Sequence, residues 1–366
     1  MSGSLGLRAN IYLNARFLGW KVTGVGRYSR EISVRLLALL SQDPRFHASA
    51  IAPGMRSAET IDQLGRPPAM SLPMAVLWEQ IALPFRARDG FLVNLSNTGP
   101  LAVRQQLVVV HDASVFAVPE NYSFAFRTWY RIAWYWLLRR ARQIVTDSQF
   151  SRNELARYCG VAAERIQVVP CGSDHLDSVV PDATVLARAG LTPGRYVLAV
   201  GTPSRAKNLK TLIEAMALLG DSGLQLAIAG EFVPLVFHAH RFELPAWART
   251  LGHVTDSELK ALYQSALCFA FPSRYEGFGL PPLEAMRCGC PVVSSTAASL
   301  PEVCGDAALY ADPGDARCLA EHIRLLASSE PARNSLRSAG LARARLYTWD
   351  AAARKLLDLI IAAGSA

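Results

Sequence analysis

The segment that decides the fold reads Leu267-Cys-Phe-Ala-Phe271-Pro-Ser-Arg-Tyr-Glu276-Gly-Phe-Gly-Leu280-Pro-Pro-Leu-Glu284-Ala-Met-Arg-Cys288-Gly-Cys-Pro291-Val-Val-Ser294. It begins with an apolar run over 267–271 and ends with another over 291–294, which is the pattern of strands buried on both faces of a parallel sheet. The stretch between them, 282–288, is predicted to be a helix that starts at a proline. A strand, a helix and a second strand in this order predict one βαβ unit.

The same alternation extends outward in both directions. Further strands are predicted at 10–13, 48–52, 90–94, 107–110, 143–146, 165–169, 196–200 and 224–230, and helices at 27–40, 74–83, 124–142, 149–158, 209–219, 257–265, 316–328, 331–347 and 349–363. Residues 171–193 are polar and show no clear periodicity, so we interpret them as a linker. The predicted fold class is α/β, with two doubly wound domains whose ligands bind beyond the carboxyl ends of the strands, in the cleft between the domains.

Length and composition describe an ordinary globular protein. The 366 residues suggest two or three domains, and 51% of them are hydrophobic and 19% charged. The formal net charge of +8 allows nucleic acid, a phosphorylated ligand or an anionic membrane surface as a partner, or no partner at all. Because no apolar stretch is long enough for a signal peptide or a membrane-spanning helix, we expect a cytoplasmic protein. Seven scattered cysteines without zinc spacing predict neither a disulfide framework nor a metal site.

Two carboxylates flank the loop that follows the strand at 267–271. Two consecutive prolines keep Glu276 and Glu284 from sharing one helix, so we place Glu276 on the loop and Glu284 in the first turn of the next helix. Loop amides and a helix N-terminus favour an anion or sugar hydroxyls, and carboxylates accept hydrogen bonds from hydroxyls. These features predict a site for a polyhydroxylated ligand. The alternative is a structural connection in which Glu284 only favours the helix dipole. The loop itself consists of Gly277, Phe278, Gly279 and Leu280.

A second candidate site follows the strand at 196–200. Its sequence is Gly201-Thr-Pro-Ser-Arg205-Ala-Lys207-Asn-Leu-Lys210. A flexible ammonium and a planar guanidinium between a strand end and a helix are suited to hold a diphosphate, and we assign this role to Arg205 and Lys207. The alternative is a solvated basic turn, which is what we expect of Lys210.

Two further candidates lie in the first half of the chain. His111 and Asp112 directly follow the buried strand at 107–110, where an imidazole beside a carboxylate can polarise or hydrogen-bond a hydroxyl. The alternative is a loop histidine satisfied by protein groups. The turn Thr23-Gly24-Val25-Gly26 opens a helix, but it is not a full GxGxxG. It also lacks the acidic residue expected about 20 positions later, so a dinucleotide fingerprint is poorly supported.

The helix predicted at 124–142 is both aromatic and basic. It carries Trp129, Tyr130, Trp134, Tyr135 and Trp136, followed by Arg139, Arg140 and Arg142. Such a helix can lie on an anionic membrane. The alternative is that the aromatic residues belong to the core and the arginines form a solvated helix end, and the sequence leaves both interpretations open.

Taken together, these segments resemble glycosyltransferase family 4, whose members are retaining enzymes of the two-domain GT-B fold. The run from Glu276 to Glu284 is similar to the family's glutamate–seven–glutamate motif, and the cysteine-glycine-cysteine-proline segment after it looks like the usual continuation. The resemblance covers roughly residues 23–349. It departs at Ala206, which separates Arg205 from Lys207, and it offers no role for Arg274. Four other segments resemble family motifs: Thr146–Leu155, Ile166–Gly172, Gly252–Leu259 and Leu300–Tyr310.

The resemblance implies a domain organisation and a set of residue roles. It implies an acceptor-binding Rossmann-like domain over 1–178 and a nucleotide-sugar-binding domain over 190–348, with parallel sheets facing across a cleft and the C-terminal helix, 349–366, packing back on the first domain. The implied roles are Glu284 on the ribose hydroxyls, Glu276 on the sugar hydroxyls, Lys207 with Arg205 on the diphosphate without a metal, His111 with Asp112 near the anomeric carbon, the amides of Gly277, Phe278, Gly279 and Leu280 on sugar and phosphate, and Gly24 and Gly26 at the phosphates.

The implied activity is that of a retaining, metal-independent hexosyltransferase without a cofactor. It would move a hexose from a nucleotide-diphosphate sugar to a saccharide or a polyprenyl-diphosphate- or lipid-linked saccharide in polysaccharide or lipopolysaccharide biosynthesis. The turn at 23–28 resembles mannosyl- and rhamnosyltransferases, so GDP-mannose is the favoured donor. We expect a peripheral protein at the inner face of an anionic plasma membrane, with no nucleic-acid partner because the basic residues form no stripe. The alternatives are a rhamnosyl- or glucosyltransferase, a phosphorylase or epimerase of the same architecture, and a non-catalytic membrane-surface binding protein.

Overall fold

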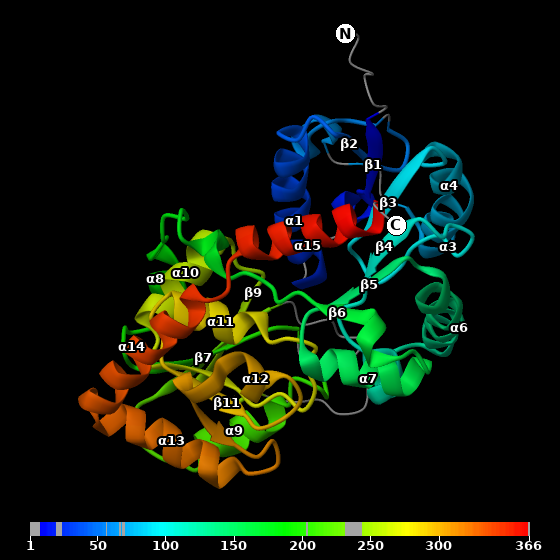
Figure 1. Cartoon of the computed structure of the whole chain (residues 1–366). Helices are drawn as coiled ribbons and strands as arrows, with labels where there is room; N and C mark the ends of the chain where they lie inside the picture. The colour runs from blue at the N-terminus through cyan, green and yellow to red at the C-terminus, as the bar shows by residue number, and fades with distance from the viewer. Residues whose placement is uncertain are drawn as a thin grey trace. The chain divides into compact units, whose positions relative to one another are not determined.

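The computed structural model describes residues 8–19, 24–55, 57–65, 67, 70–202, 204–230 and 244–364. The chain divides into two units, each with its own parallel sheet (Figure 1). The N-terminal unit comprises Met1–Gly172 and Trp349–Ala366, and the C-terminal unit comprises Ser173–Thr348. The division after Gly172 falls inside the stretch 171–193 that we interpreted as a linker.

The sheet of the N-terminal unit has the strand order β2-β1-β3-β4-β5-β6, and all neighbouring strands run parallel. The chain leaves β1 towards β2 and then returns across β1 to β3. Because crossovers between parallel strands are right-handed, the helix after β1 and the helices after β2 cover opposite faces of the sheet. The six strands are β1 (Ala9–Asn14), β2 (Phe46–Ile51), β3 (Gly90–Asn94), β4 (Gln106–Val109), β5 (Gln143–Thr146) and β6 (Ile166–Val168).

The helices of this unit begin at residues that satisfy their free backbone N–H groups. The Ser123 side chain accepts a hydrogen bond from the N–H of Phe126 at the start of α6, and Ser148 accepts one from Ser151 at the start of α7. The helical elements are η1 (Arg16–Gly19), α1 (Gly24–Ser41), α2 (Ile61–Leu64), α3 (Leu72–Leu77), the π-helical turn η2 (Trp78–Ala82), α4 (Leu83–Arg86), α5 (Ser114–Ala117), η3 (Pro119–Asn121), α6 (Phe124–Arg140), α7 (Gln149–Cys159), η4 (Ala163–Arg165) and α15 (Trp349–Gly364).

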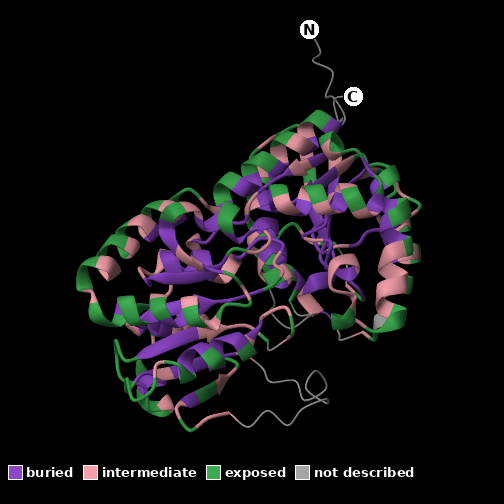
Figure 2. Ribbon diagram, turned by 90° about the horizontal axis from the view of Figure 1, so that it is seen from below, coloured by how far each residue is buried: buried purple, intermediate pink, exposed green. Residues whose placement is uncertain are grey.

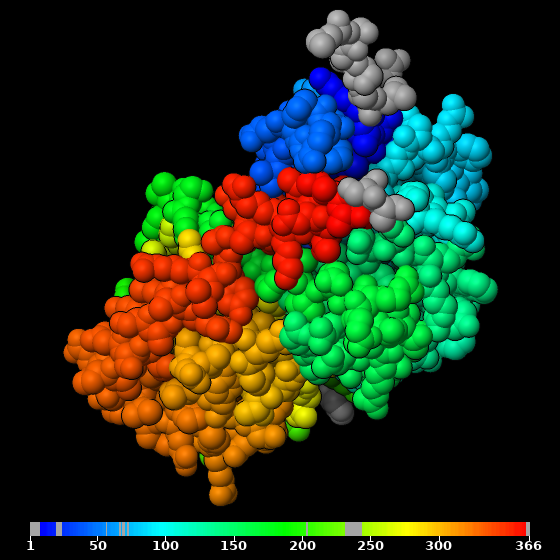
Figure 3. Space-filling model, in the orientation of Figure 1, coloured from blue at the N-terminus to red at the C-terminus, as the bar shows by residue number. Residues whose placement is uncertain are grey.

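The last helix, α15, packs against α1 and so completes the N-terminal unit (Figures 1 and 3). Trp349 at its start is buried, and its ring meets the Tyr28 ring edge-on with the centroids 5.8 Å apart. Leu356 and Ile360, four residues apart on one face of α15, are buried as well. The apolar face that the sequence shows at 349–363 is therefore covered within the N-terminal unit.

The C-terminal unit repeats the architecture with a sheet of order β12-β11-β10-β7-β8-β9, again parallel throughout. Its strands are β7 (Tyr196–Val200), β8 (Gln225–Ala229), β9 (Ala248–Gly252), β10 (Cys268–Phe271), β11 (Val292–Ser295) and β12 (Ala308–Ala311). Its helical elements are η5 (Asp174–Leu176), α8 (Thr184–Ala189), α9 (Leu209–Ala217), α10 (Asp256–Ser265), α11 (Leu280–Arg287), α12 (Leu300–Cys304), η7 (Gly305–Ala307), α13 (Ala316–Ser328) and α14 (Glu330–Arg345). In both units the central strands are largely buried, and exposed residues lie mostly on the outer faces of the helices and at the sheet edges (Figure 2).

The predicted alternation of strands and helices is confirmed, and the differences have local causes. The strands β9 and β12 were not predicted, because each is an edge strand with partly exposed residues rather than a continuous buried apolar run. The prediction that 171–193 is irregular is wrong for α8, which at six residues is too short to show a helical period. The helix after the first glycine turn begins at Gly24, three residues earlier than predicted, and Thr23 lies outside the described residues.

Candidate functional site

Lys207 lies on the turn between β7 and α9 of the C-terminal unit. Its Nζ atom donates a hydrogen bond to Glu276 Oε1 at 2.8 Å and stands 4.7 Å from the centre of the Phe271 ring. Its stem runs along Gly201, which has a φ of 133°, and a Cβ added there would lie 3.2 Å from Lys207 Cε. Glycine at this position therefore lets the lysine lie against the strand end. With side chains 28% and 15% exposed, Lys207 and Glu276 form an ion pair that solvent can reach.

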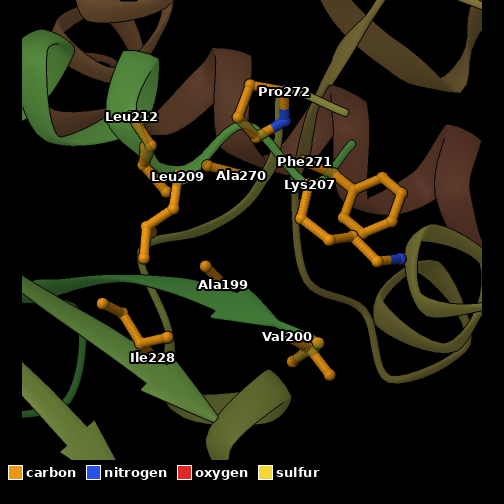
Figure 4. A pocket seen from close by; sticks show the side chains of 10 residues that line it. Ala199, Val200, Lys207, Leu209, Leu212, Ile228, Ala270, Phe271 and Pro272 are labelled. Carbon is orange, nitrogen blue, oxygen red and sulfur yellow. The ribbon is translucent and has the colours of Figure 1, made fainter. Parts of the chain in front are cut away.

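A small hollow opens beside this ion pair at the carboxyl ends of β7 and β10 (Figure 4). In the close view, the Lys207 nitrogen lies beside the Phe271 ring and points away from Leu212 and Ile228. The ammonium group therefore stands at the edge of an otherwise apolar hollow, at the strand ends where open parallel sheets bind ligands. The hollow is lined by Ala199, Val200, Gly201, Lys207, Leu209, Leu212, Ile228, Ala270, Phe271 and Pro272.

Asn208 ties the lysine turn to the loop after β10. Its backbone is left-handed, with a φ of 56°, and its Nδ2 donates to the carbonyl oxygens of Pro272 and Pro313 at 2.9 and 2.6 Å. Arg274 Nε donates to Asn208 Oδ1 at 3.1 Å, and the Arg274 N–H donates to the Ala206 carbonyl at 2.7 Å. Arg274, for which the family resemblance offered no role, thus links the two segments that carry the ion pair.

A buried serine, Ser299, contacts backbone carbonyl groups of the glycine-containing loop before α11. Ser299 Oγ lies 2.9 Å from the carbonyl oxygen of Glu276 and 2.7 Å from that of Phe278. Gly279 has a φ of 108°, and a Cβ there would stand 2.8 Å from Leu300 Cδ2, so both backbone conformation and space require glycine. The loop position of Glu276 agrees with the prediction, whereas sequence reasoning did not find Ser299, because an isolated serine is no signal of its own.

The helix that carries Glu284 begins earlier than predicted. It starts at Leu280 rather than Pro282, because both prolines fit the first turn, where backbone N–H groups have no partner inside the helix. Glu284 is consequently the fifth residue of α11, and the prediction that it lies in the first turn is wrong. Its side chain is therefore aimed by the second turn of the helix rather than by the helix N-terminus.

Glu284 is buried and has two protein partners. The Tyr263 hydroxyl donates to Glu284 Oε2 at 3.2 Å, and His175 Nε2 lies 3.1 Å from Glu284 Oε1. Burial raises the pKa of the Tyr263 phenol well above its ordinary value, and the Glu284 carboxylate raises it further, so the phenol stays protonated and remains a donor. Sequence reasoning missed both partners. A carboxylate oxygen accepts more than one hydrogen bond, so Glu284 keeps capacity for a ligand hydroxyl.

His111 occupies the corresponding strand end of the N-terminal unit, just after β4. It is buried, and its Nδ1 lies 2.6 Å from Asp147 Oδ2, while its Nε2 lies 3.0 Å from the carbonyl oxygen of Leu95. The ring meets Tyr28 of α1 edge-on, with the centroids 4.7 Å apart, and the His111 N–H donates to Asn97 Oδ1 at 2.8 Å. Because both ring nitrogens face acceptors, the ring can satisfy both only as a doubly protonated imidazolium.

The charge of this histidine follows from two opposing effects. Burial by itself lowers the pKa of His111, but the Asp147 charge, the hydrogen bond to that carboxylate and the hydrogen bond to the Leu95 carbonyl outweigh it. The pKa of His111 is therefore raised above its ordinary value of 6.5. The site thus holds a buried cation–anion pair.

The carboxylate that holds the imidazole is not its neighbour in the sequence. We predicted Asp112 beside His111, but Asp112 Oδ1 accepts a hydrogen bond from the N–H of Ser114, which shapes the turn into α5. Asp147 directly follows β5, and β5 pairs with β4 in the sheet, so the two strand ends are adjacent. The strand pairing, which the sequence does not state, brings Asp147 to His111.

The remaining predicted site residues are spread over both units. Gly24 is exposed at the first residue of α1, where an added Cβ would meet no atom within 4 Å, and Gly26 is buried as the third residue of the same helix. Arg205 is exposed on the Lys207 turn. Within the described ranges, no group of three or more His, Cys, Asp or Glu side chains could hold a metal ion. The seven cysteines are free thiols, and in the part of the chain that the structure describes every helix is too short or too polar to traverse a bilayer.

Two family models match the chain. The model described as "Glycosyl transferases group 1" matches residues 189–343, and the model described as "Glycosyltransferase Family 4" matches residues 101–175. The chain is also 30% identical over 363 residues to the O-antigen chain mannosyltransferase B of Escherichia coli, which covers 90% of this chain and 94% of the relative.

Solved structures resemble the whole chain at lower sequence identity. The sucrose-phosphate synthase from Thermosynechococcus elongatus is 22% identical with a TM-score of 0.74, covering 96% of this chain and 98% of that one. The Anabaena protein Alr3699/HepE in complex with UDP and glucose is 18% identical with a TM-score of 0.71, covering 97% and 100%. Together with the two parallel six-stranded sheets, these likenesses confirm the predicted fold class, two doubly wound α/β domains of the GT-B type.

Proposed function

This chain belongs to glycosyltransferase family 4, and on that basis we propose that it is a retaining, metal-independent mannosyltransferase. Its donor would be GDP-mannose, and its acceptor a saccharide or a lipid-linked saccharide of surface polysaccharide biosynthesis. The mannose assignment draws on the E. coli O-antigen chain mannosyltransferase B, whose alignment spans nearly the full length of both chains. In this proposal the N-terminal unit binds the acceptor and the C-terminal unit binds the donor.

The observation that carries the proposal is the accessible ion pair between Lys207 and Glu276. Without a donor, each charge neutralises the other at 2.8 Å. When a nucleotide diphosphate reaches this strand end, its β-phosphate offers Lys207 a second anion and leaves Glu276 free to accept hydrogen bonds from the sugar hydroxyls. The ion pair thus holds a cation and an acceptor in place before the donor binds. The diphosphate of the donor would then contact Lys207, and its sugar would contact Glu276.

Lys207 would act mainly in bond breaking. The bond between the anomeric carbon and the β-phosphate oxygen breaks, the acceptor oxygen bonds to the same carbon, and its proton ends on the departing nucleoside diphosphate. Negative charge grows on the β-phosphate during this step. A cation held in place by the Phe271 ring and Gly201 meets that charge without moving, which is how preorganised groups lower a barrier. Arg205, exposed on the same turn, would add a second cation.

Glu284 would hold the ribose of the nucleotide. It is fixed by the Tyr263 hydroxyl on one oxygen and by His175 near the other, so its orientation is set before the donor binds. The amides from Gly277 to Leu280 would contact the sugar and the phosphates from a loop that Ser299 supports. Each contact is of the kind expected for a rigid site that orients its ligand.

In the N-terminal unit, the role proposed for His111 requires a change of hydrogen-bond partner. Both nitrogens of His111 are engaged by protein acceptors, so a contact with the sugar requires the ring to exchange the Leu95 carbonyl for a sugar hydroxyl. Asp112 would contact the sugar from the turn after His111. Gly24 and Gly26, in the first turn of α1, would let backbone N–H groups approach the phosphates.

One alternative is supported by a specific observation. The structural relative Alr3699/HepE is described in complex with UDP and glucose, which favours a uridine donor and a glucosyltransferase. A rhamnosyltransferase and a non-catalytic membrane-surface binding protein remain the other candidates from the sequence.

A ligand panel followed by a transfer assay tests the proposal. GDP, UDP, dTDP and ADP are added separately, and we expect GDP alone to raise Tm, by about 5–10 °C at about 100 times its Kd. Labelled GDP-mannose is then offered with polyprenyl-diphosphate-linked saccharides, and the anomeric configuration of the product is determined by NMR. We expect retention, and we expect turnover to survive EDTA. A rise in Tm with UDP alone would favour the glucosyltransferase over the mannosyltransferase. A rise in Tm with GDP but no transfer of mannose would favour the non-catalytic binding protein.

A further inference from the structure

Large apolar side chains are exposed in two helical segments of the N-terminal unit. Of the thirteen large hydrophobic side chains that are exposed among the described residues, eight lie in α6 or in the continuous helical segment 72–86, formed by α3, η2 and α4. The other five are scattered singly over the rest of the molecule, which is ordinary for a protein surface. The eight are Met74, Leu77, Ile81, Phe85, Phe124, Ile132, Tyr135 and Trp136.

Helix α6 is apolar on two faces. One face, with Trp134 and Leu138 among its residues, is buried against the sheet. The other face exposes Ile132, Tyr135 and Trp136, at spacings of three and four residues that place them together on the helix surface. The core interpretation is confirmed for Trp134, whereas Tyr135 and Trp136 are exposed, and the membrane interpretation stays a prediction. The exposed half is not explained by the fold.

The segment 72–86 carries a second exposed stripe. Met74, Leu77, Ile81 and Phe85 are three, four and four residues apart, so they follow one face of the helix. Each is more than half exposed, and Phe85 reaches 71%. The opposite face buries Leu83 and the carboxylate of Glu79. The sequence predicted a helix at 74–83 but did not identify this stripe.

The two stripes belong to the same side of the sheet. The segment 72–86 connects β2 to β3 and α6 connects β4 to β5, and both crossings run in the same direction along the strand order, so both cover the same face. Figures 1 and 3 show α3, α4 and α6 along one side of the N-terminal unit. Side-chain contacts agree, since Gln80 of η2 bonds to the carbonyl of Gly99 and the N–H of Leu101, and Leu101 packs on the cluster under α6.

The exposed charged side chains of α6 and of the segment 72–86 are of one sign. α6 contains four arginines and no aspartate or glutamate. In 72–86 the one carboxylate, Glu79, is buried beside Arg16 at 3.2 Å, and Arg86 is the one cation. The Arg139 guanidinium stacks 3.8 Å from the centre of the Tyr135 ring, which places a cation over an exposed aromatic residue. Along the chain, the nearest exposed acids are Asp89, three residues after the segment 72–86, and Glu120, four residues before α6.

We propose that the α3–α4 and α6 stripes together dock the N-terminal unit on the headgroup region of an anionic phospholipid bilayer. Exposed Trp and Tyr rings favour the interface between lipid and water, and helices lie in that interface when apolar side chains are flanked by arginines. Each arginine near an anionic surface strengthens binding by about fivefold. The surface binds lipid on its own, so this inference does not rest on the proposed transfer reaction.

Charge complementarity selects the bilayer over a second copy of the chain. In a two-fold dimer through this side, the arginines of one copy would face the arginines of the other, and like charges across an interface oppose association. An anionic lipid surface meets the same arginines with opposite charge. The apolar stripes by themselves would suit either occupant.

Vesicle flotation of the full chain tests the proposal without donor or acceptor. The probes are vesicles of phosphatidylcholine alone and of equal parts phosphatidylcholine and phosphatidylglycerol. We expect binding to the anionic vesicles only, weakened by added salt. Phe85→Ser and Phe124→Ser, at side chains 71% and 72% exposed, should each lower binding about tenfold. Arg140→Glu should lower it about fivefold or more.

Matched variants in the C-terminal unit serve as controls. Val180→Ser and Leu346→Ser change side chains that are 79% and 69% exposed, and Arg317→Glu changes an exposed arginine of α13, so none of them should alter binding. An unchanged Tm shows that each variant folds. Equal binding to both vesicle types, or equal losses in the stripe and control variants, would overturn the proposal. So would a dimer in sedimentation that Phe85→Ser dissociates, which would assign the surface to a second copy.

Discussion

Each of the two sheets carries a pair of oppositely charged side chains beyond its strand ends. The distances within the two pairs are similar, but one pair is buried and the other is partly exposed. In the N-terminal unit His111 and Asp147 approach to 2.6 Å, and both side chains are buried. In the C-terminal unit Lys207 and Glu276 approach to 2.8 Å, but 28% and 15% of their side chains remain exposed. In the first pair the remaining ring nitrogen of His111 also faces a backbone carbonyl, whereas the Lys207 ammonium stands beside the Phe271 ring (Figure 4).

Because the two pairs differ in burial, we expect them to have different roles, one in stability and the other in ligand binding. Separating a buried pair leaves a charge in a medium of low dielectric constant, which typically costs about 3–5 kcal/mol, so the His111–Asp147 pair fixes the loops around it. An exposed pair is worth only about 0–1 kcal/mol, so a ligand can divide Lys207 from Glu276 at little cost. Changes at the open pair should therefore act on turnover, and changes at the buried pair on stability.

The largest effect is expected at the open pair. Lys207→Ala removes the cation that meets the growing charge on the β-phosphate, and we expect kcat to fall by about 10²–10³ while the fold survives. Steady-state kinetics with saturating donor measure the loss.

The neighbouring lysine provides the control. Lys210 is 77% exposed and pairs with Glu214 one turn away on α9, so Lys210→Ala should leave kcat unchanged. Turnover of Lys207→Ala within about threefold of the wild type would remove the diphosphate role from this residue.

An intermediate effect is expected at Glu284. Glu284→Gln keeps an oxygen that can accept from Tyr263 but removes the charge, so it tests the ribose contact without leaving the phenol unpartnered. We expect the donor Kd to rise about tenfold, which corresponds to one charge-assisted hydrogen bond, and calorimetry measures it.

A second variant separates ribose binding from positioning. Tyr263→Phe removes a donor to Glu284 but leaves the carboxylate, so it should weaken donor binding less than Glu284→Gln does. The opposite order, or an unchanged Kd in Glu284→Gln, would show that the carboxylate does not contact the nucleotide.

The smallest effect is a pH dependence of stability at the buried pair. Because the pKa of His111 is raised in the folded protein, its charge stabilises the fold in full below the unfolded value near 6.5, and this stabilisation is lost as the pH rises through the folded pKa. The loss amounts to about 1.4 kcal/mol for each unit by which the pKa is raised. Urea unfolding between about pH 6 and 8 should show it in the wild type and not in Asp147→Asn.

An exposed histidine gives the reference for this measurement. His47 lies exposed on β2, so His47→Asn should keep the wild-type dependence of the free energy of unfolding on pH. Identical curves for Asp147→Asn and the wild type would mean that the imidazole does not carry the charge that its two acceptors imply.

Much of the fold could be predicted because its pattern is local. Buried parallel strands are short apolar runs, and β3, β5 and β7 begin and end at the predicted residues. Two edge strands and one short helix were missed because they lack such a local pattern. The edge strands β9 and β12 mix buried and exposed residues, and α8 is too short to establish a period.

In the candidate site, too, local features could be predicted from the sequence and contacts between distant residues could not. Glu276 and Lys207 could be placed from the sequence, because each stands just after a strand end. Their contact with each other could not, because 69 residues separate them along the chain. The same holds for Tyr263 and His175 around Glu284, and for Ser299 under the loop.

The sequence by itself determined the alternation of strands and helices, the fold class, and which residue types stand at the strand ends, because each of these depends on a few neighbouring residues. Only the tertiary structure decided which of these residues meet. Pairing of β4 with β5 gives His111 the carboxylate of Asp147 rather than that of its neighbour Asp112. Tertiary packing also divides the aromatic residues of α6 between core and surface, because an amphipathic pattern cannot separate two apolar faces until one of them is covered.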